Sequence, residues 1–271
     1  MQDPIADAPN LTKYGNARGY DAYMGHWSTA LAPLLLQFAD VAQSRSILDI
    51  GCGTGSLLMA AAAQNASARL VGIDPAAALL RRARQRPELA GVSLIEGSAE
   101  TLRFADAEFD ACLSLLVLQE FSDQPRVMSE MRRVTRPGGA VAACQWDFAR
   151  MPVIDALVAA INATAPGLGA PLSGSSPHVI TNEAELAALW TGAGFRDVVA
   201  DRLPVTREFE NFDALWQPLL TGSTPSTLTL AAMPRAQQVS VRARMQARFG
   251  IENPDAEFSL TAEALVVRGR A

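Results

Sequence analysis

Three glycines at alternate positions, Gly51, Gly53 and Gly55, follow a short apolar run, 47–50, that contains Asp49. An apolar run that stops at glycines and continues into an alanine-rich stretch predicts a strand, a tight turn and a helix. Glycine allows positive φ and close approach to a ligand, and the first turn of a helix offers free N–H groups to a negative group. This arrangement is typical of a site for a nucleotide-like cofactor.

A second acidic residue, Asp74, ends the apolar run 69–74 and follows Gly55 by 19 residues. That spacing fits one β-α-β unit, with the carboxylate at the strand end, where it can accept hydrogen bonds from both hydroxyls of a ribose. Asp74 also precedes Pro75–Ala76–Ala77, so it could cap a helix, and the two roles are compatible.

A third loop, Gly97–Ser98–Ala99–Glu100, is expected at the same edge of the sheet. The N–H of Ala99, with Ser98 or Glu100 beside it, can bind the edge of an adenine. All three loops follow predicted strands, and open parallel sheets bind ligands outside the carboxyl ends of their strands.

The elements that must position these loops are five apolar runs that alternate with helical patterns, which predicts an open, mostly parallel α/β sheet. The runs cover 47–50, 69–74, 92–96, 109–118 and 140–144, and Arg136–Pro137–Gly138–Gly139 is expected to stop the helix before the fifth. A sixth strand is expected around Val198–Val199–Ala200. The alternating stretch 258–268 predicts a last strand, antiparallel and at or near the edge.

Two further segments are expected to surround the site. The segment 14–28 holds all three tyrosines and His26, and it either packs on the core or forms a flap over the cofactor pocket; a helix is expected over 27–42. Residues 209–249 predict a mostly helical insertion containing Trp216. The predicted organisation is therefore an N-terminal flap (1–28), a core (29–208 and 258–271) and a helical insertion over the substrate pocket (209–257). Residues 1–13 and 166–177 show no regular pattern.

Composition limits the class of protein. The chain has 271 residues, of which 49% are hydrophobic and 19% charged, with a net charge of −5. These values suit one large globular domain with an elaboration, and the negative charge disfavours a nucleic-acid surface. No apolar run reaches the roughly 18 residues of a membrane helix, and residues 1–10 do not resemble a signal peptide, so a cytoplasmic monomer or homodimer is expected. The three cysteines lack metal-ligand spacing and are expected to be free buried thiols; no metal site is predicted.

The order and spacing of these motifs resemble the class I S-adenosylmethionine-dependent methyltransferases. The stretch 47–55 looks like their glycine motif, Gly72–Ile73–Asp74 like their ribose-binding acid, and 97–100 like their adenine loop. Outside 45–145, Tyr20–Ser28, Trp146–Asp147 and Phe258–Ala262 resemble a bacterial subgroup that acts on small molecules. The resemblance implies a Rossmann-like, doubly wound, seven-stranded sheet with an antiparallel last strand and a helical lid.

The resemblance also implies that the cofactor is S-adenosylmethionine, with S-adenosylhomocysteine as product. Asp49 is expected to orient the glycine loop and the amino group of the cofactor, and Leu115 to line its methionine end. Relatives tend to have arginine where this chain has His26, so a role for His26 toward the cofactor's carboxylate requires the protonated imidazole. The complete expected set is Asp49, Gly51, Cys52, Gly53, Gly55, Asp74, Pro75, Ser98, Ala99, Glu100, Leu115, Tyr20 and His26.

Methyl transfer from a sulfonium is an in-line displacement, for which the protein supplies orientation and desolvation. A general base is needed only for an acceptor that arrives protonated with a high pKa. The candidate bases are Glu120, His26, Asp147 and His178; Glu120 also suits a helix cap, and His178 suits a surface position. The expected contacts of a small, apolar or aromatic acceptor are Trp27, Gln119, Trp146 and Trp216, of which Trp146 either stacks on the acceptor or seals the core.

Two other functions fit parts of the pattern. A nicotinamide-dependent oxidoreductase also carries a glycine-rich turn and an acid at this distance, but the spacing G-x-G-x-G, in place of G-x-G-x-x-G, weighs against it. A non-catalytic protein that binds S-adenosylmethionine as a sensor or scaffold also fits, because no residue is an unambiguous base.

Overall fold

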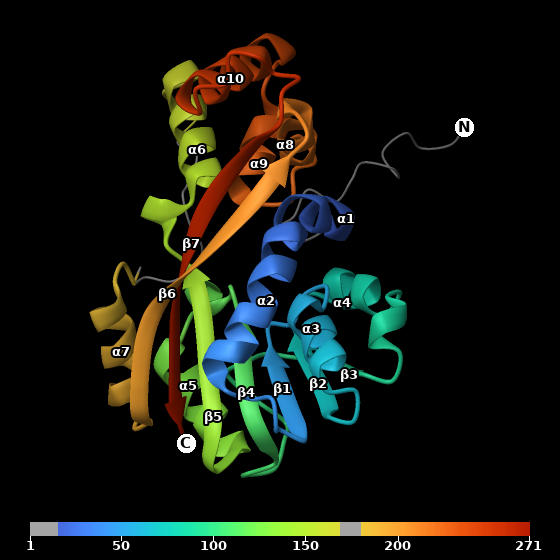
Figure 1. Ribbon diagram of the computed structural model, residues 1–271, viewed down its shortest axis with the longest axis vertical. Coiled ribbons are helices and arrows are strands. Elements are labelled where there is room, and N and C mark those ends of the chain that lie inside the picture. Colours follow the sequence, from blue (N-terminus) through green and yellow to red (C-terminus); the bar gives the residue numbers. More distant parts are fainter. Residues whose placement is uncertain (1–15, 169–179) are drawn as a thin grey trace.

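The computed structural model describes residues 16–168 and 180–271, and within these ranges seven strands form one sheet (Figure 1). The strand order is β3-β2-β1-β4-β5-β7-β6. Strands β1 to β5 are parallel, β7 is antiparallel to β5, and β6 is antiparallel to β7. The strands are β1 Ser46–Ile50, β2 Arg69–Asp74, β3 Ser93–Glu96, β4 Phe109–Leu115, β5 Thr135–Trp146, β6 Arg196–Phe209 and β7 Phe258–Arg270. The predicted fold is confirmed.

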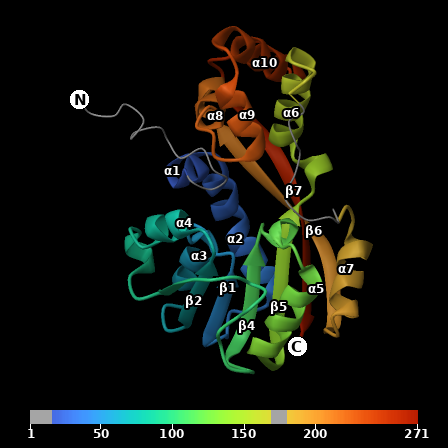
Figure 2. The ribbon, with the colours of Figure 1, turned by 180° about the vertical axis from the view of Figure 1, so that it is seen from behind.

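Helices cover both faces of the sheet (Figures 1 and 2). On one face lie α2 (His26–Ala39), α3 (Ser56–Gln64) and α4 (Ala77–Ala83); on the other lie α5 (Gln124–Val134) and α7 (Glu183–Gly192). Successive residues of a strand point to opposite faces. Leu113 and Trp146 therefore pack on the α2 side, whereas Cys112 and Val141 pack against α5 and α7. Burial on both faces explains the near-continuous apolar runs of the central strands.

The start of β5 differs from the prediction. The strand begins at Thr135, directly after α5, and not at Ala140. Thr135 pairs with Phe109, and pairing resumes between Ala140 and Ala111, so the intervening segment bulges out of the ladder. Gly139 is required there because a Cβ atom would lie 2.7 Å from the carbonyl oxygen of Asp110. Glycines that permit a bulge inside a strand look, in sequence, like glycines that end a helix.

A helical layer lies beyond one end of the sheet (Figure 1). It contains α6 (Pro152–Thr164), α8 (Phe212–Leu219), α9 (Pro225–Ala232) and α10 (Arg235–Arg248). Helix α6, which precedes the predicted insertion, packs against α10 and α9. Strands β6 and β7 extend into this layer, since their pairing continues as far as Phe209 and Phe258. Among the described residues, no helix is both long and apolar enough to cross a bilayer.

A continuous helical run from Ala17 to Ala39 crosses the α2 face. It consists of α1 (Ala17–Tyr20), the π-helical turn η1 (Asp21–Gly25) and α2. The helix that was predicted over 27–42 is therefore part of a longer run, which begins at Ala17 and ends at Ala39. π-turns are rare and occur frequently at functional sites. The predicted residues Tyr14 and His178, with most of the irregular segments 1–13 and 166–177, lie outside the described residues.

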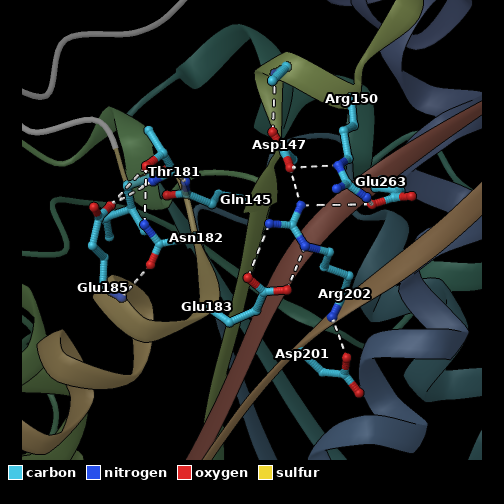
Figure 3. A network of polar contacts seen from close by, with 12 residues as sticks. Gln145, Asp147, Arg150, Thr181, Asn182, Glu183, Glu185, Asp201, Arg202 and Glu263 are labelled. Atoms are coloured by element: carbon cyan, nitrogen blue, oxygen red, sulfur yellow. Dashed lines mark hydrogen bonds and ion pairs between the residues drawn. The ribbon is translucent and has the colours of Figure 1, made fainter.

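A network of ion pairs and hydrogen bonds connects β6 with neighbouring elements on the α7 face of the sheet (Figure 3). The guanidinium of Arg202 donates hydrogen bonds to both oxygens of Glu183 and to Asp147, at the carboxyl end of β5. Arg150, in the short helix η4 (Phe148–Arg150), pairs with Glu263 of β7 at 2.8 Å. The candidate base Asp147 is thereby held in an ion pair away from the cofactor loops.

The Arg202→Met variant is expected to lose about 1–2 kcal/mol of unfolding free energy, because the buried Asp147 carboxylate loses the closer of its two arginine partners while most of the arginine's apolar stem is retained. Denaturant titration measures the loss. Arg248→Met removes a pair whose two side chains are 52% and 40% exposed, so its effect should stay within about 0.5 kcal/mol. Equal effects of the two substitutions would contradict a structural role for the Arg202 network.

Candidate cofactor site

The loop between β1 and α3 has the backbone conformation that glycine allows. Gly51, Gly53 and Gly55 all have positive φ, at 71°, 54° and 89°. A Cβ atom at Gly51 would lie 2.5 Å from Val117, and one at Gly55 would lie 2.3 Å from Leu89. Gly51 and Gly55 are therefore required by packing as well as by conformation.

A cavity of about 160 Å³ lies at the carboxyl ends of β1, β2 and β4. The predicted site residues in its lining are Tyr20, Gly51, Gly53, Asp74, Pro75, Ser98, Ala99, Glu100 and Glu120. The lining also includes Ile73, Ala76, Leu79, Gly97, Leu116, Val117 and Phe121. Loops that are far apart in the sequence thus meet at one edge of the sheet, as the parallel topology requires.

Asp74 connects the loops on either side of the cavity. One carboxylate oxygen accepts a hydrogen bond from the N–H of Gly53 at 2.9 Å, and the other accepts one from the N–H of Ala76 at 2.7 Å. The side chain of Asp74 makes no hydrogen bond to the first turn of α4, which begins at Ala77. It therefore stabilises a local turn before the helix and does not act as the helix cap that the sequence also allowed. Burial raises the pKa of Asp74, and the two N–H groups oppose that rise.

Asp49 lies on β1, directly before the glycine loop, and is 1% exposed. Neither of its carboxyl oxygens has a hydrogen-bond partner. Burial, followed by the nearby negative charge of Asp74, raises the pKa of Asp49 well above its ordinary value. A buried acid without a partner is costly in a native protein, and a cationic ligand group would remove that cost.

Besides Asp49, which is buried behind the lining, four of the predicted cofactor residues lie outside the cavity. Cys52 and Gly55 pack behind the loop; Leu115 is buried in the core on the α2 side. The next residue, Leu116, has a φ of 63°, which turns the chain so that Leu116 and Val117 reach the cavity. This left-handed residue has no signal in the sequence, since leucine rarely adopts that conformation.

His26 is the fourth of these residues. Its side chain is exposed, in a surface depression with Arg18, Asp21, Arg82 and Arg86. Partial desolvation and the charge of Arg207 lower the pKa of His26, so its imidazole is neutral at neutral pH. A contact of protonated His26 with the cofactor stays a prediction that this position does not favour.

Tyr20 and Glu120 face the cavity from α1 and from the short helix η3 (Leu118–Glu120). Burial, together with the negative charges of Asp74 and Glu120, raises the pKa of the Tyr20 hydroxyl. Tyr20 therefore remains protonated and can donate a hydrogen bond. Of the predicted bases, Glu120 is the one found in the lining of this cavity.

The predicted acceptor residues lie mainly along the α2 face. The rings of Trp27 and Trp146 meet edge to face with centroids 6.1 Å apart. Trp216 stacks on Phe212 in the helical layer. Gln119 is buried, and its amide donates to the carbonyl of Leu116 at 2.9 Å. The structure thus brings Trp27 and Trp146 together and places Gln119 beside the cofactor cavity.

The seven-stranded sheet, the glycine loop and the two buried acids have the arrangement of a class I S-adenosylmethionine-dependent methyltransferase domain. Residues 48–143, about a third of the chain, match the family described as "Methyltransferase domain". Over these residues the chain is similar to that family, and the match supports S-adenosylmethionine as its cofactor. The residues present fit this cofactor, because the unpartnered acid Asp49 can receive its ammonium group and Asp74 its ribose hydroxyls.

The similarity to individual proteins is partial. A malonyl-[acyl-carrier protein] O-methyltransferase of Xylella fastidiosa is 40% identical over 96 residues, which are 35% of this chain and 32% of that protein. An uncharacterized 37.1 kDa protein in transposon TN4556 of Streptomyces fradiae is 31% identical over 150 residues, or 55% of this chain and 40% of that protein. The matches thus span about two fifths or less of these relatives.

A solved structure shares the fold more completely. Phosphoethanolamine N-methyltransferase 2 of Haemonchus contortus, determined with phosphomonomethylethanolamine and S-adenosylhomocysteine, superimposes with a TM-score of 0.55. The alignment covers 94% of this chain and 56% of that chain at 16% identity. A sequence identity of 16% supports a common fold and no closer relation.

Proposed function

We propose that this protein transfers a methyl group from S-adenosylmethionine to a small-molecule acceptor by in-line displacement. The observation that carries the proposal is the buried, unpartnered carboxyl of Asp49 beside a cavity formed by the glycine loop and Asp74. The names of two similar proteins support it, since one is an O-methyltransferase and the other an N-methyltransferase solved with a small substrate.

Each part of the site has a proposed role. Asp74 and the loop 97–100, which line the cavity, hold the ribose hydroxyls and the adenine. Asp49, buried behind the lining two residues before Gly51, holds the amino group of the cofactor. Leu116 and Val117 take over the role first expected of Leu115 and line the methionine end. The bound cofactor supplies an electrophilic methyl group on a sulfonium, so what remains for the protein is to orient the acceptor and to exclude water.

Glu120 is the proposed proton acceptor, because it lies in the cavity wall opposite the glycine loop. It serves an acceptor that must lose a proton, whereas an already ionised acceptor requires no base. The hydroxyl of Tyr20 is proposed to donate a hydrogen bond in the same cavity, since its raised pKa keeps it protonated.

Binding and turnover measured separately test the proposal. Calorimetry should show binding of S-adenosylhomocysteine and none of NADH, and labelled S-adenosylmethionine should transfer its methyl group to members of a panel of small phenols, amines and carboxylates. Tighter binding of NADH would favour an oxidoreductase. Tight S-adenosylhomocysteine binding without transfer to any member of the panel would favour a non-catalytic sensor or scaffold.

A further inference from the structure

Within the part of the chain that the structure describes, four polar side chains on the α2 face of the sheet have no hydrogen-bond or ion-pair partner. The hydroxyl of Tyr23 and the indole nitrogens of Trp27 and Trp146 are buried without a hydrogen bond, in side chains that are 1%, 0% and 2% exposed. The fourth side chain is the half-buried Arg207. Its guanidinium lies 4.4 Å from the ring centroid of Phe209, and within the described residues it forms no ion pair with a carboxylate.

The strand register places two of these groups, Trp146 and Arg207, on one face of the sheet. Trp146 pairs with Ala264, and Ala264 pairs with Leu203, so their side chains point to the same face. Alternation along β6 then puts Arg207 and Phe209 on that face as well. Trp27, on α2, contacts both Trp146 and Phe209, with its ring centroid 6.1 Å from that of Trp146 and 6.5 Å from that of Phe209. The charge of Arg207 also opposes the rise that burial causes in the pKa of Tyr23, which agrees with a position of both groups on this face.

This group, called here the donor cluster (Tyr23, Trp27, Trp146 and Arg207), is connected to the cofactor cavity through two elements. Tyr20 lines that cavity, and Tyr23 and Trp27 follow it on the buried side of the same helical run. On the sheet, the carbonyl of Cys144 accepts a hydrogen bond of 2.9 Å from the N–H of Leu116, which lines the cavity. Trp146 comes two residues after Cys144, so the helical run and strand β5 both lead from the neighbourhood of the cavity to the cluster.

The chemistry of the cluster determines what could complete it. Indole and guanidinium groups donate hydrogen bonds and do not accept them. A buried donor without a partner is destabilising, and native proteins leave few such donors. A ligand that satisfies this cluster must offer acceptor oxygens and a negative charge for Arg207. The surrounding rings of Trp27, Trp146 and Phe209 require that the rest of the ligand be apolar.

We propose that the methyl acceptor is an organic carboxylate with an apolar, aromatic or acyl, body, and that Arg207 and the hydroxyl of Tyr23 bind its carboxylate. The indole N–H groups of Trp27 and Trp146 complete the contacts to its oxygen atoms. The assignment of this ligand as the acceptor rests on the proposed function, whereas its binding to the donor cluster does not.

Binding to the protein saturated with S-adenosylhomocysteine tests the inference. The probes are benzoate, 3-phenylpropanoate and decanoate, each compared with its primary amide, and 2-phenylethylamine. At least one carboxylate should bind tenfold or more tightly than its amide, and the amine should not bind. Arg207→Met should abolish this preference, Arg207→Lys should keep part of it, and Tyr23→Phe should weaken carboxylate binding about threefold to tenfold.

Two controls separate binding from structure. Arg196→Met, at the far end of β6, should leave probe binding unchanged, and all variants should bind S-adenosylhomocysteine within twofold of the parent protein. The ligand-free melting temperature of Arg207→Met should be equal to or above that of the parent, since a desolvated charge is removed; a clear decrease would show a structural role and overturn the inference.

The remaining outcomes also decide the question. A lack of preference for every carboxylate over its amide, or a preference that persists in Arg207→Met, would overturn the inference. Carboxylates that bind through Arg207 but receive no methyl group from S-adenosylmethionine would instead contradict the proposed function and leave the binding site standing.

Discussion

Replacement of Asp49 by asparagine is expected to change cofactor affinity and protein stability in opposite directions. The Kd for S-adenosylhomocysteine should rise about thirtyfold or more, because the buried partner of the ligand's ammonium, worth about 2–3 kcal/mol, is lost. The ligand-free protein should gain about 1–2 kcal/mol of unfolding free energy at neutral pH, since the acid at this position is buried without a partner. If Asp49 served only packing, its replacement would lower both the cofactor affinity and the stability of the protein.

The pH dependence of the parent protein follows from the raised pKa of Asp49. The unfolded chain loses this proton near the ordinary value of 3.8, whereas the folded chain retains it to higher pH. Unfolding therefore releases a proton, and this contribution to stability is complete below pH 3.8 and is lost as pH rises toward the folded pKa. Binding of an ammonium favours the ionised acid and releases the same proton, so cofactor affinity should rise as pH increases from 3.8 toward the folded pKa.

Calorimetry in two buffers of different ionisation enthalpy measures the released proton, and thermal melts across the same pH range measure stability. Both pH effects should disappear in Asp49→Asn. Asp106→Asn, which removes the same charge from an aspartate whose side chain is 80% exposed, should change neither. Proton release that persists in Asp49→Asn would mean that another group responds to the cofactor.

Asp74→Ala is expected to weaken cofactor binding tenfold or more, corresponding to about 1.5–3 kcal/mol. Two effects combine in this variant. The proposed acceptor of the ribose hydroxyls is lost, and the N–H groups of Gly53 and Ala76 lose the carboxylate that holds the two loops. Asp74→Asn should be affected less than Asp74→Ala, because its amide oxygen can still accept one of these N–H bonds.

The matched control is Asp123→Ala, in which a carboxylate that accepts the N–H of Arg126 at the start of α5 is removed outside the cavity. It should cost about 1 kcal/mol of stability and leave the Kd for S-adenosylhomocysteine unchanged. If adenosine alone bound Asp74→Ala as tightly as the parent protein, the ribose assignment would be wrong, since adenosine retains the ribose and lacks the methionine part.

The sheet and the cofactor loops could be predicted because their signals are local. Each parallel strand is one apolar run, and each loop follows the carboxyl end of a strand, so topology alone brings Gly51, Asp74 and Ala99 to one cavity. The bulge in β5 and the left-handed Leu116 could not be predicted, because both depend on pairing with neighbouring strands.

The donor cluster was only partly predictable. Trp27 and Trp146 were expected near the acceptor, but their contact with each other depends on the helix crossing the sheet. Tyr23 is predictable only as part of the segment 14–28, and no role is predictable for Arg207. One feature of the sequence does point to Arg207. Alternate residues of β6 share one face of the strand, and Arg207 is the charged residue in the series Leu203, Val205, Arg207 and Phe209.

The π-turn η1 sets the register of the first helical run. It separates Tyr20, in the cofactor cavity, from Trp27, in the donor cluster. A π-turn holds about one residue more than an α-helical turn, because its hydrogen bonds run from residue i to residue i+5. Deletion of one residue within 21–25 would therefore convert the wide turn to an ordinary one and leave Tyr20 and Trp27 in nearly the same directions. The wide turn thus allows one additional residue between the cofactor cavity and the donor cluster without changing the position of either, so it is the point of the helical run at which a single insertion or deletion could be tolerated during evolution.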